Sequence, residues 1–246
     1  MTDFRSLHLG RPPGDPLVLP GPWDAASARV FAEAGFPALA TPSAGIAAAL
    51  GYADGETPAD EMFAAIGRIV RAVEGLGVAV SADIEAGYGL PPDEIAGRLL
   101  DAGVVGCNLE DSSGGALTDP QENADRLAAV RAAAGGALFI NARVDTYIRG
   151  VHDPAQAIDR ARRYLAAGAD CVYPIMAPPE QLPALASGVG APLNAVFLPD
   201  GPSPRELGEL GATRVTFGPG LHRQSMERLR QDANTLAGPP ADVPGS

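Results

Sequence analysis

Short apolar runs alternate along the chain with longer segments whose apolar residues recur at helical spacing. The apolar runs predict strands at Leu17–Pro20, Ala38–Thr41, Val78–Asp83, Val104–Leu109, Leu138–Arg143, Cys171–Ile175, Leu193–Phe197 and Arg214–Phe217. The other segments predict helices at Ala25–Ala34, Ala59–Glu74, Pro92–Ala102, Gln121–Ala134, Pro154–Ala167, Glu180–Ser187, Pro204–Leu210 and Ser225–Leu236. Strands and helices that alternate strictly in this way indicate parallel βαβ units.

Glycines and prolines mark the ends of these elements. Gly35, for example, follows a predicted helix and can adopt the left-handed conformation that closes it. Asp119 before Pro120 pairs a capping residue with a proline suited to the first helical turn. The pattern predicts an α/β fold that closes as a (β/α)8 TIM barrel, with an open doubly wound sheet as the alternative. We expect a single barrel domain over residues 1–237 and a flexible C-terminal tail over residues 238–246.

The composition narrows the possible functions. The chain has 30 acidic and 18 basic residues, a formal net charge of −12, and 46% hydrophobic residues. Such an acidic surface repels polyanions, so we expect no nucleic-acid partner. No run reaches the roughly 18 apolar residues that a membrane span needs, and the N-terminus has no apolar secretory segment. We therefore expect a cytoplasmic protein with no membrane partner.

All 18 basic residues are arginines. The absence of lysine from the sequence excludes a Schiff-base aldolase, a pyridoxal-phosphate lysine and a P-loop, because each needs an ε-amino group. Cys107 and Cys171 lie inside apolar runs, and we expect them to be buried free thiols. His152 and His222 follow two predicted strands and could reach their ends, although ordinary surface histidines are the simpler interpretation.

Acidic and basic side chains gather where three successive strands end. Asp83 and Glu85 are two residues apart, so both carboxylates lie on one face of a strand. Glu110 ends the next strand, and Arg143 ends the one after it. Because barrel active sites form at these strand ends, the four side chains should meet at one mouth. The alternative is that the acids are ordinary loop residues and that Arg143 pairs with Glu110 or Asp145.

Crowded carboxylates repel one another unless they are protonated or bridged by a cation. Oxygen ligands without histidine or cysteine favour Mg²⁺ or Mn²⁺ over zinc. We therefore expect a divalent metal on the carboxylates of residues 81–85 and 109–111, which include Asp111. Arg143 beside that metal would hold a substrate carboxylate or phosphonate with two hydrogen bonds.

Several segments together resemble the isocitrate lyase/phosphoenolpyruvate mutase superfamily over nearly the whole chain. They are residues 19–29, 34–38, 41–45, 50–55, 81–89, 108–112, 140–145 and 218–220. The resemblance implies a phosphoenolpyruvate mutase-like (β/α)8 barrel that forms a homo-oligomer, a dimer or tetramer with the last helix exchanged between subunits. It also implies Mg²⁺ and a small 2-oxo acid or phosphonate substrate, with C–C or C–P bonds made or broken beside an enolate.

The resemblance also implies a role for individual residues. Asp83 corresponds to the direct metal ligand, with Glu85 and Glu110 holding the metal through water. Asp54 corresponds to a loop carboxylate near the reacting group, so the implied catalytic residues are Asp54, Glu110 and Arg143. The implied substrate contacts are Trp23 as a pocket wall, Thr41, Ser43, Ala44 and Gly45 around an oxyanion hole, Asn141 and Arg143.

The segment Ser112–Asp119 departs from the superfamily's pattern. The lyases carry a gating loop with a Lys-Lys-Cys-Gly-His motif at this place, and the mutases use Lys and Asn; this segment has none of these residues. The leading hypothesis is a Mg²⁺-dependent lyase that cleaves a C–C bond of a small 2-oxo or 2-hydroxy di- or tricarboxylate, similar to oxaloacetate decarboxylase or methylisocitrate lyase. The alternatives are C–P bond chemistry on phosphoenolpyruvate or phosphonopyruvate, and a catalytically silent barrel that binds a small acid.

Overall fold

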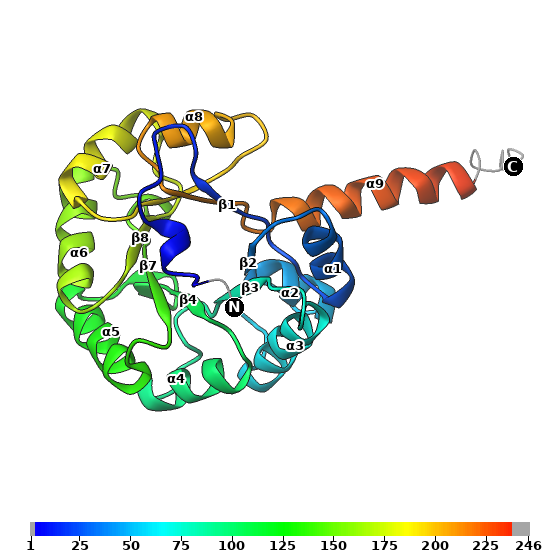
Figure 1. The fold of residues 1–246 in the computed structure, drawn as a ribbon, viewed down its shortest axis with the longest axis horizontal. Coiled ribbons are helices and arrows are strands. Elements are labelled where there is room, and N and C mark those ends of the chain that lie inside the picture. The colour runs from blue at the N-terminus through cyan, green and yellow to red at the C-terminus, as the bar shows by residue number, and fades with distance from the viewer. Residues whose placement is uncertain (1–2, 238–246) are drawn as a thin grey trace, which may run out of the picture.

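Parallel strands surround a common axis, and helices form a ring outside them (Figure 1). The computed structural model describes residues 3–237. The barrel strands are β1 (Leu17–Leu19), β2 (Ala38–Thr41), β3 (Ala79–Asp83), β4 (Gly106–Leu109), β7 (Phe139–Val144), β8 (Cys171–Pro174), β9 (Asn194–Val196) and β10 (Arg214–Thr216). The helices are α1 (Ala25–Glu33), α2 (Ser43–Leu50), α3 (Ala59–Ala72), α4 (Pro92–Asp101), α5 (Pro120–Ala134), α6 (Pro154–Ala166), α7 (Leu182–Val189), α8 (Pro204–Glu209) and α9 (Gly220–Ala237), with short 3-10 turns η1 (Ser6–His8), η2 (Tyr147–Arg149) and η3 (Pro179–Gln181).

Two arcs of parallel strands make up the barrel. One arc has the strand order β2-β3-β4-β7-β8, and the other has the order β1-β10-β9. A parallel bridge between Val172 and Leu193 joins β8 to β9. On the other side, the Ala40 amide donates a hydrogen bond to the Pro20 carbonyl at 3.1 Å, between β2 and the end of β1. The strands therefore close into a ring, which confirms the predicted (β/α)8 barrel and shows that the open doubly wound alternative is wrong.

Most apolar side chains pack between the strands and the outer helices. Helix α3, for example, buries Met62, Ile66 and Ile69 completely. Their spacing of three and four residues places them on one face of the helix, against the barrel. The amphipathic pattern that predicted the helices is thus the pattern that packs them.

Helix α2 was not predicted, and α9 begins earlier than predicted. The α2 segment, Ser43–Leu50, is apolar nearly all round, so it has no polar face through which a helical period could be recognised. Helix α9 begins at Gly220 rather than Ser225 and projects away from the barrel (Figure 1). Its first turn packs against the barrel, where His222 meets Trp23, and most of the rest of its length is exposed.

The segment after β4 forms a hairpin at the mouth of the barrel. Strands β5 (Ser112–Ser113) and β6 (Ala116–Leu117) pair in antiparallel fashion. Gly114 and Gly115 connect them with φ values of 56° and 85°, the positive angles that a two-residue hairpin turn requires. The Gly-Gly pair was therefore the signal for a hairpin in this segment.

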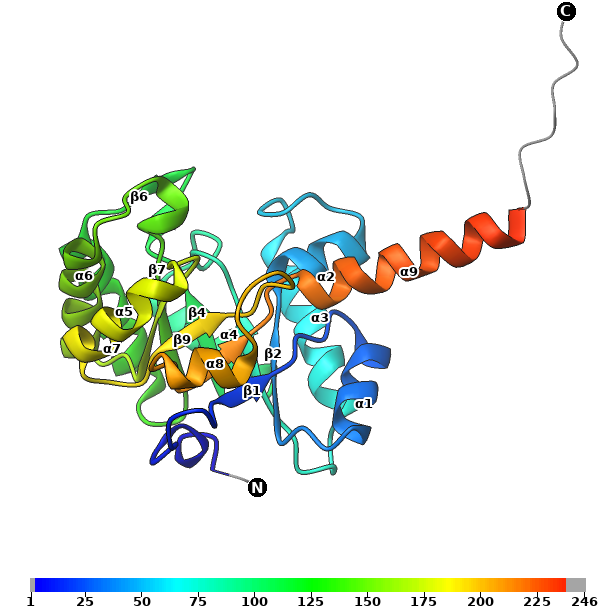
Figure 2. The same ribbon diagram turned by 90° about the horizontal axis from the view of Figure 1, so that it is seen from above.

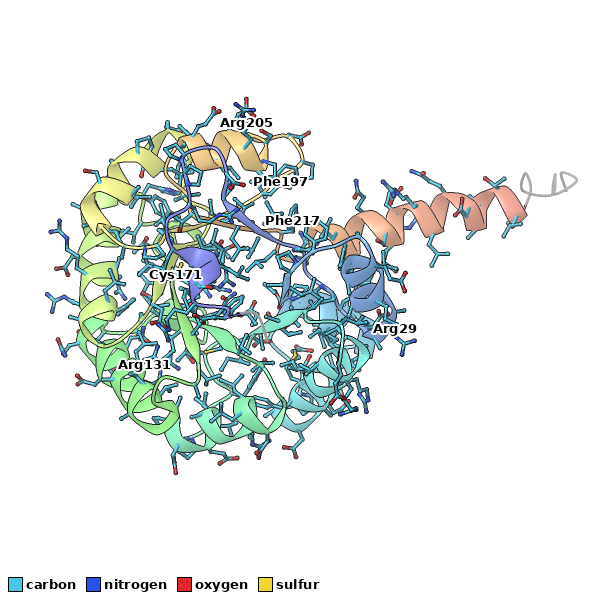
Figure 3. The ribbon with its side chains drawn as sticks, viewed as in Figure 1. Arg29, Arg131, Cys171, Phe197, Arg205 and Phe217 are labelled. Carbon is cyan, nitrogen blue, oxygen red and sulfur yellow. The ribbon has the colours of Figure 1, made fainter. Side chains whose placement is uncertain are left out.

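The opposite end of the barrel is closed by η1. His8 stacks on Phe139 with ring centroids 4.0 Å apart, and Phe4 meets both rings edge-on. Cys171 belongs to the same apolar cluster and lies within the ring of helices, whereas Arg205 lies on outer helix α8 (Figure 3). Figure 2 shows η1 at one end of the barrel and the hairpin at the other.

Some further expectations can be compared directly with the structure. Cys107 and Cys171 are free and fully buried, as predicted. Within residues 3–237, no helix combines the length and the apolar character needed to cross a bilayer. The expected tail, residues 238–246, lies outside the described residues.

Candidate active site

A cavity of about 970 Å³ opens at the C-terminal ends of the strands. Side chains at or just beyond the ends of β2, β3, β4, β7, β8 and β10 line it, together with the hairpin. Asp83, Glu85, Glu110 and Arg143 all face this cavity, as the sequence predicted. The location is the one at which barrel enzymes place their active sites.

Asp83 ends β3 and lies at the floor of the cavity. Its Oδ2 accepts a hydrogen bond from the Ser43 hydroxyl at 3.1 Å, and its backbone amide donates to the Thr41 hydroxyl at 3.3 Å. Burial raises the pKa of the Asp83 carboxyl, while the nearby Arg143 charge and the Ser43 hydrogen bond oppose that rise. The carboxylate is thus oriented by neighbouring strand ends but poorly compensated for its lost hydration.

Glu85 and Glu110 flank Asp83 and share its environment. Burial, followed by the negative charge of Asp83, raises the pKa of Glu85 to about 7. The same two causes raise the pKa of Glu110 to about 9. Glu85 Oε1 is buried without a hydrogen-bond partner among the described residues, and the residue has a φ of 52°, which is unusual for a side chain with a Cβ. Unpartnered polar atoms and backbone strain of this kind concentrate at functional sites.

Arg143 projects from β7 into this group of acids. Its Nε and Nη2 donate to the two carboxylate oxygens of Asp145 at 2.6 and 3.1 Å, and its Nη1 forms an ion pair with Glu110. Asp145 is fully buried. The pairing that the sequence left open therefore exists with both acids, and it holds the guanidinium in place at the cavity wall.

Asp111 does not belong to the site, although it follows Glu110 directly. Its carboxylate accepts hydrogen bonds from Arg160 at 2.9 Å, from the Tyr164 hydroxyl at 2.7 Å and from the backbone amide of Asp145 at 2.7 Å. Consecutive residues of an extended chain point to opposite sides, so one acid faces the cavity and the next faces α6. The expected contribution of Asp111 to a metal site is therefore wrong.

The first turn of α2 faces Asp83 and supplies the predicted oxyanion-hole segment. Ser43 and Ala44 line the cavity, whereas Gly45 lies just beneath, packed against Pro42. The first amides of a helix have no partner within it; that of Ser43 donates to Asp83, and the next ones are left to donate to a ligand. The predicted N–H donors are therefore ordered by a helix that the sequence pattern did not reveal.

The remaining predicted residues lie at different depths. Thr41 lines the cavity, and Asp54 lies at its exposed rim. Trp23 does not line the cavity; its ring packs edge-on against His222, with centroids 5.2 Å apart. Asn141 is fully buried below the floor. The expected wall role of Trp23 and the direct substrate contact of Asn141 are thus not supported, because packing holds both side chains outside the cavity.

Asn108 and Arg149 are among the cavity residues that the sequence-based site did not include. Asn108 lines the floor, and its side-chain oxygen accepts hydrogen bonds from Asn141 at 2.8 Å and from buried Arg214 at 3.3 Å. Its two-residue separation from Glu110 could have revealed it. Arg149 ends the short 3-10 turn η2 after β7, which is too brief for a repeating period to indicate direction.

The acids around the cavity have a geometry and a charge that bear on metal binding. Within residues 3–237, no three acidic, histidine or cysteine side chains lie close enough together to ligate one ion directly. Asp83, Glu85 and Glu110 nevertheless face one cavity, with raised pKa values and an unpartnered Glu85 oxygen. That donor set fits a hard cation bound directly by one carboxylate and otherwise through water, which is the usual preference of Mg²⁺.

Comparison with known proteins identifies the family. A proposed phosphonomutase from Burkholderia cenocepacia has a crystal structure that matches with a TM-score of 0.84 at 40% identity, over 94% of this chain and 97% of that one. A Mycobacterium tuberculosis protein without an assigned function is 38% identical over 217 residues, 87% of this chain and 81% of its own length. The 2-methylisocitrate lyase of Halalkalibacterium halodurans is 31% identical over 201 residues, 76% of this chain and 65% of its own length. Since the family model described as phosphoenolpyruvate phosphomutase matches residues 4–237, the chain belongs to that family, within the isocitrate lyase/phosphoenolpyruvate mutase superfamily.

Proposed function

We propose that this protein is a Mg²⁺- or Mn²⁺-dependent lyase that cleaves a C–C bond of a small 2-oxo or 2-hydroxy di- or tricarboxylate through an enolate. The observation that carries the proposal is the group of three acids around one cavity beside Arg143: Glu110 is buried, and Asp83 and Glu85 are half-buried. Burial raises the pKa of all three carboxyls, and the charge of Asp83 raises those of Glu85 and Glu110 further; a divalent cation would offset both effects. The similarity to a 2-methylisocitrate lyase supports C–C cleavage as the reaction class.

The described residues divide the work of such a reaction. Asp83 would hold the metal directly, while Glu85 and Glu110 would bind its waters. When bound, the metal supplies Lewis-acid stabilisation of a carbonyl that becomes an enolate. The amides at the start of α2 would donate to the same developing charge. Arg143 has N–H groups beyond those that bind Asp145 and Glu110, and these would orient a substrate carboxylate.

We assign proton transfer to acids of the cavity and not to the hairpin. The hairpin has no lysine, cysteine or histidine, so it cannot supply the acid that the lyases carry at this place. The proposal assigns proton transfer to Asp54 at the rim and Glu110 at the floor, both of which line the cavity. Burial raises the pKa of Glu110 to about 9, which suits a group that holds a proton near neutral pH.

A substrate panel tests the proposal. Oxaloacetate, 2,3-dimethylmalate, 2-methylisocitrate and phosphonopyruvate are assayed with Mg²⁺, with Mn²⁺ and with EDTA. We expect turnover of at least one carboxylate substrate and its loss in EDTA. Turnover that persists in EDTA would overturn the metal-dependent lyase proposal.

A second candidate is C–P bond chemistry, as a mutase or a hydrolase. The similarity to a proposed phosphonomutase over nearly the full length of both chains favours it. Phosphorus NMR of phosphonopyruvate incubated with the protein separates the two candidates. A new phosphate or phosphate-ester signal would favour the phosphonate reaction, and its absence beside turnover of a carboxylate would favour the lyase.

We also propose that α9 packs against a second copy of the chain in a dimer or tetramer. The helix projects from the barrel (Figure 2), and Met226, Leu229 and Leu236 on it are 36%, 59% and 87% exposed. Their spacing places them on one face, which suits burial against a partner. Light scattering should give an oligomer for the wild type and a smaller species for Leu229→Asp; a monomeric wild type would contradict this assembly.

A further inference from the structure

The cavity contains arginines that the proposed chemistry does not use. Arg126, Arg143, Arg149 and Arg223 all line it. Arg126 is engaged with the backbone carbonyls that follow β3 and β4, and Arg143 is paired with two acids. In the part of the chain that the structure describes, neither Arg149 nor Arg223 forms an ion pair. Two positive charges at the opening are therefore free to meet an anion.

Arg149 differs from Arg223 because it is connected to the inner site. Its Nη2 donates a hydrogen bond to the Ser112 hydroxyl at 3.1 Å. That hydroxyl in turn donates to Asp145, which holds Arg143 through two hydrogen bonds. The Arg149 guanidinium is thus positioned by the base of the hairpin, one hydroxyl and one carboxylate away from Arg143.

We propose that Arg149, tethered by Ser112, is a specificity-determining residue that binds the outer carboxylate of a dianionic substrate. This inference rests on the proposed function, in which the floor of the cavity holds the end of the substrate that bears the 2-oxo or 2-hydroxy group. A substrate with a second carboxylate would extend toward the opening, where Arg149 offers an unpaired cation with several N–H donors. The tether limits the freedom that the side chain loses when an anion binds.

The charges around the opening make this contact selective. Asp54, Asp83, Glu85, Glu110 and Glu122 also line the cavity, and their charges repel an incoming dianion. A single free arginine on the hairpin side offsets that repulsion locally. An acid with only one carboxylate has no group to place there, so Arg149 should discriminate between the two classes rather than strengthen all binding.

A matched pair of stable 2-hydroxy acids tests the assignment without requiring turnover. Malate and lactate share the 2-hydroxy acid group, and malate has the additional carboxylate. Calorimetry with Mg²⁺ compares the wild type with Arg149→Gln, Arg149→Lys and Ser112→Ala. We expect Arg149→Gln to weaken malate binding by about tenfold and leave lactate binding unchanged, since a charge-assisted hydrogen bond is lost. Arg149→Lys should retain part of the affinity, and Ser112→Ala should lose less than Arg149→Gln.

Two controls remove the same charge elsewhere. Arg223→Gln removes it from the α9 side of the cavity, and Arg68→Gln removes it from the outer surface of α3. Neither should change the preference for malate over lactate. Equal losses for both ligands in Arg149→Gln, the same selective loss in Arg223→Gln, or no preference for malate in the wild type would each overturn the assignment. Because the readout is binding, these outcomes are distinguishable from failure of the substrate panel.

Discussion

The two ends of the barrel are built from the same strands but carry opposite kinds of side chain. At the N-terminal end, His8 stacks on Phe139 and the chain closes over an apolar cluster. At the C-terminal end, Asp83 and Arg143 face an open cavity among other charged groups. Strand β7 contributes to both, because Phe139 and Arg143 lie on its inward face four residues apart. The difference separates stability from chemistry: one end contributes packing, and the other contains charges that packing alone would disfavour.

Burial lowers the pKa of a histidine at the closed end and raises the pKa of an acid at the open end. It lowers the pKa of the His8 imidazole to about 3, with the Arg214 charge as the next cause. It raises the pKa of Glu110 to about 9. In each case the low dielectric of the interior disfavours the charged form. His8 therefore remains neutral near neutral pH, whereas the acids at the open end are poised to accept a cation or hold a proton.

The largest expected effect is a loss of turnover without a loss of stability, from a substitution at the open end. Asp83→Asn removes the proposed direct metal ligand, and we expect turnover to fall by roughly a thousandfold or more. The free energy of unfolding in EDTA should stay equal or rise, because the variant removes a buried carboxyl whose charge is poorly compensated. Turnover and urea unfolding are measured on the same preparation.

Asp159→Asn is the matched control for that variant. Asp159 lies on the outer face of α6, where it pairs with Arg163 at 2.9 Å. Its replacement should change neither turnover nor stability appreciably. Wild-type turnover in Asp83→Asn would contradict the proposed metal site.

At the closed end, we expect a substitution to lower stability and to leave turnover unchanged. Phe139→Ala should lower the free energy of unfolding by about 3 kcal/mol, because it opens a cavity between His8 and Phe4. Turnover per folded molecule should remain unchanged, since the cavity lies at the other end of β7. Phe31→Ala removes a half-buried ring on α1 and should cost only about 1 kcal/mol. A loss of turnover in folded Phe139→Ala would show that the two ends are coupled.

The smallest expected effect is a pH dependence of the free energy of unfolding, which originates from His8 at the closed end. An unfolded histidine with a pKa near 6.5 takes up a proton below that pH, whereas folded His8, with a pKa of about 3, does not. Its contribution to stability is therefore fully present above about pH 6.5 and is lost as the pH falls toward 3. Between pH 7 and pH 5 the wild type should lose about 2 kcal/mol more than His8→Phe.

Urea unfolding in EDTA at the two pH values measures this difference. The acids of the open end contribute a pH dependence of the opposite sign. Their raised pKa values make the folded state take up protons before the unfolded state as the pH falls, which favours folding. They are identical in the two proteins, so the comparison isolates His8. Equal losses in the wild type and the variant would show that His8 is not held neutral.

Sequence patterns were sufficient where the order and direction of the strands decide a position. Strand order brought Asp83, Glu110 and Arg143 to one mouth. Glu85 reaches the same mouth from beyond the end of β3, with a φ of 52°, and not through the strand period that predicted it. The patterns were insufficient where contacts with residues far along the chain decide which way a side chain points. Asp111 follows a site residue but turns toward α6, and nothing in the chain near it specifies Arg160 as its partner.

By itself, the sequence determined the barrel, its eight strands and the mouth at which four charged side chains gather, because these depend on alternation and on the direction of parallel strands. Only the tertiary structure decided which polar groups face the cavity at that mouth. Helix α2 gave no amphipathic signal, Trp23 packs on His222, and Arg149 is placed by a hydroxyl on another loop. Contacts between residues far apart in the chain leave no repeating pattern in the sequence. The side chains that make them are therefore positioned only when the barrel closes.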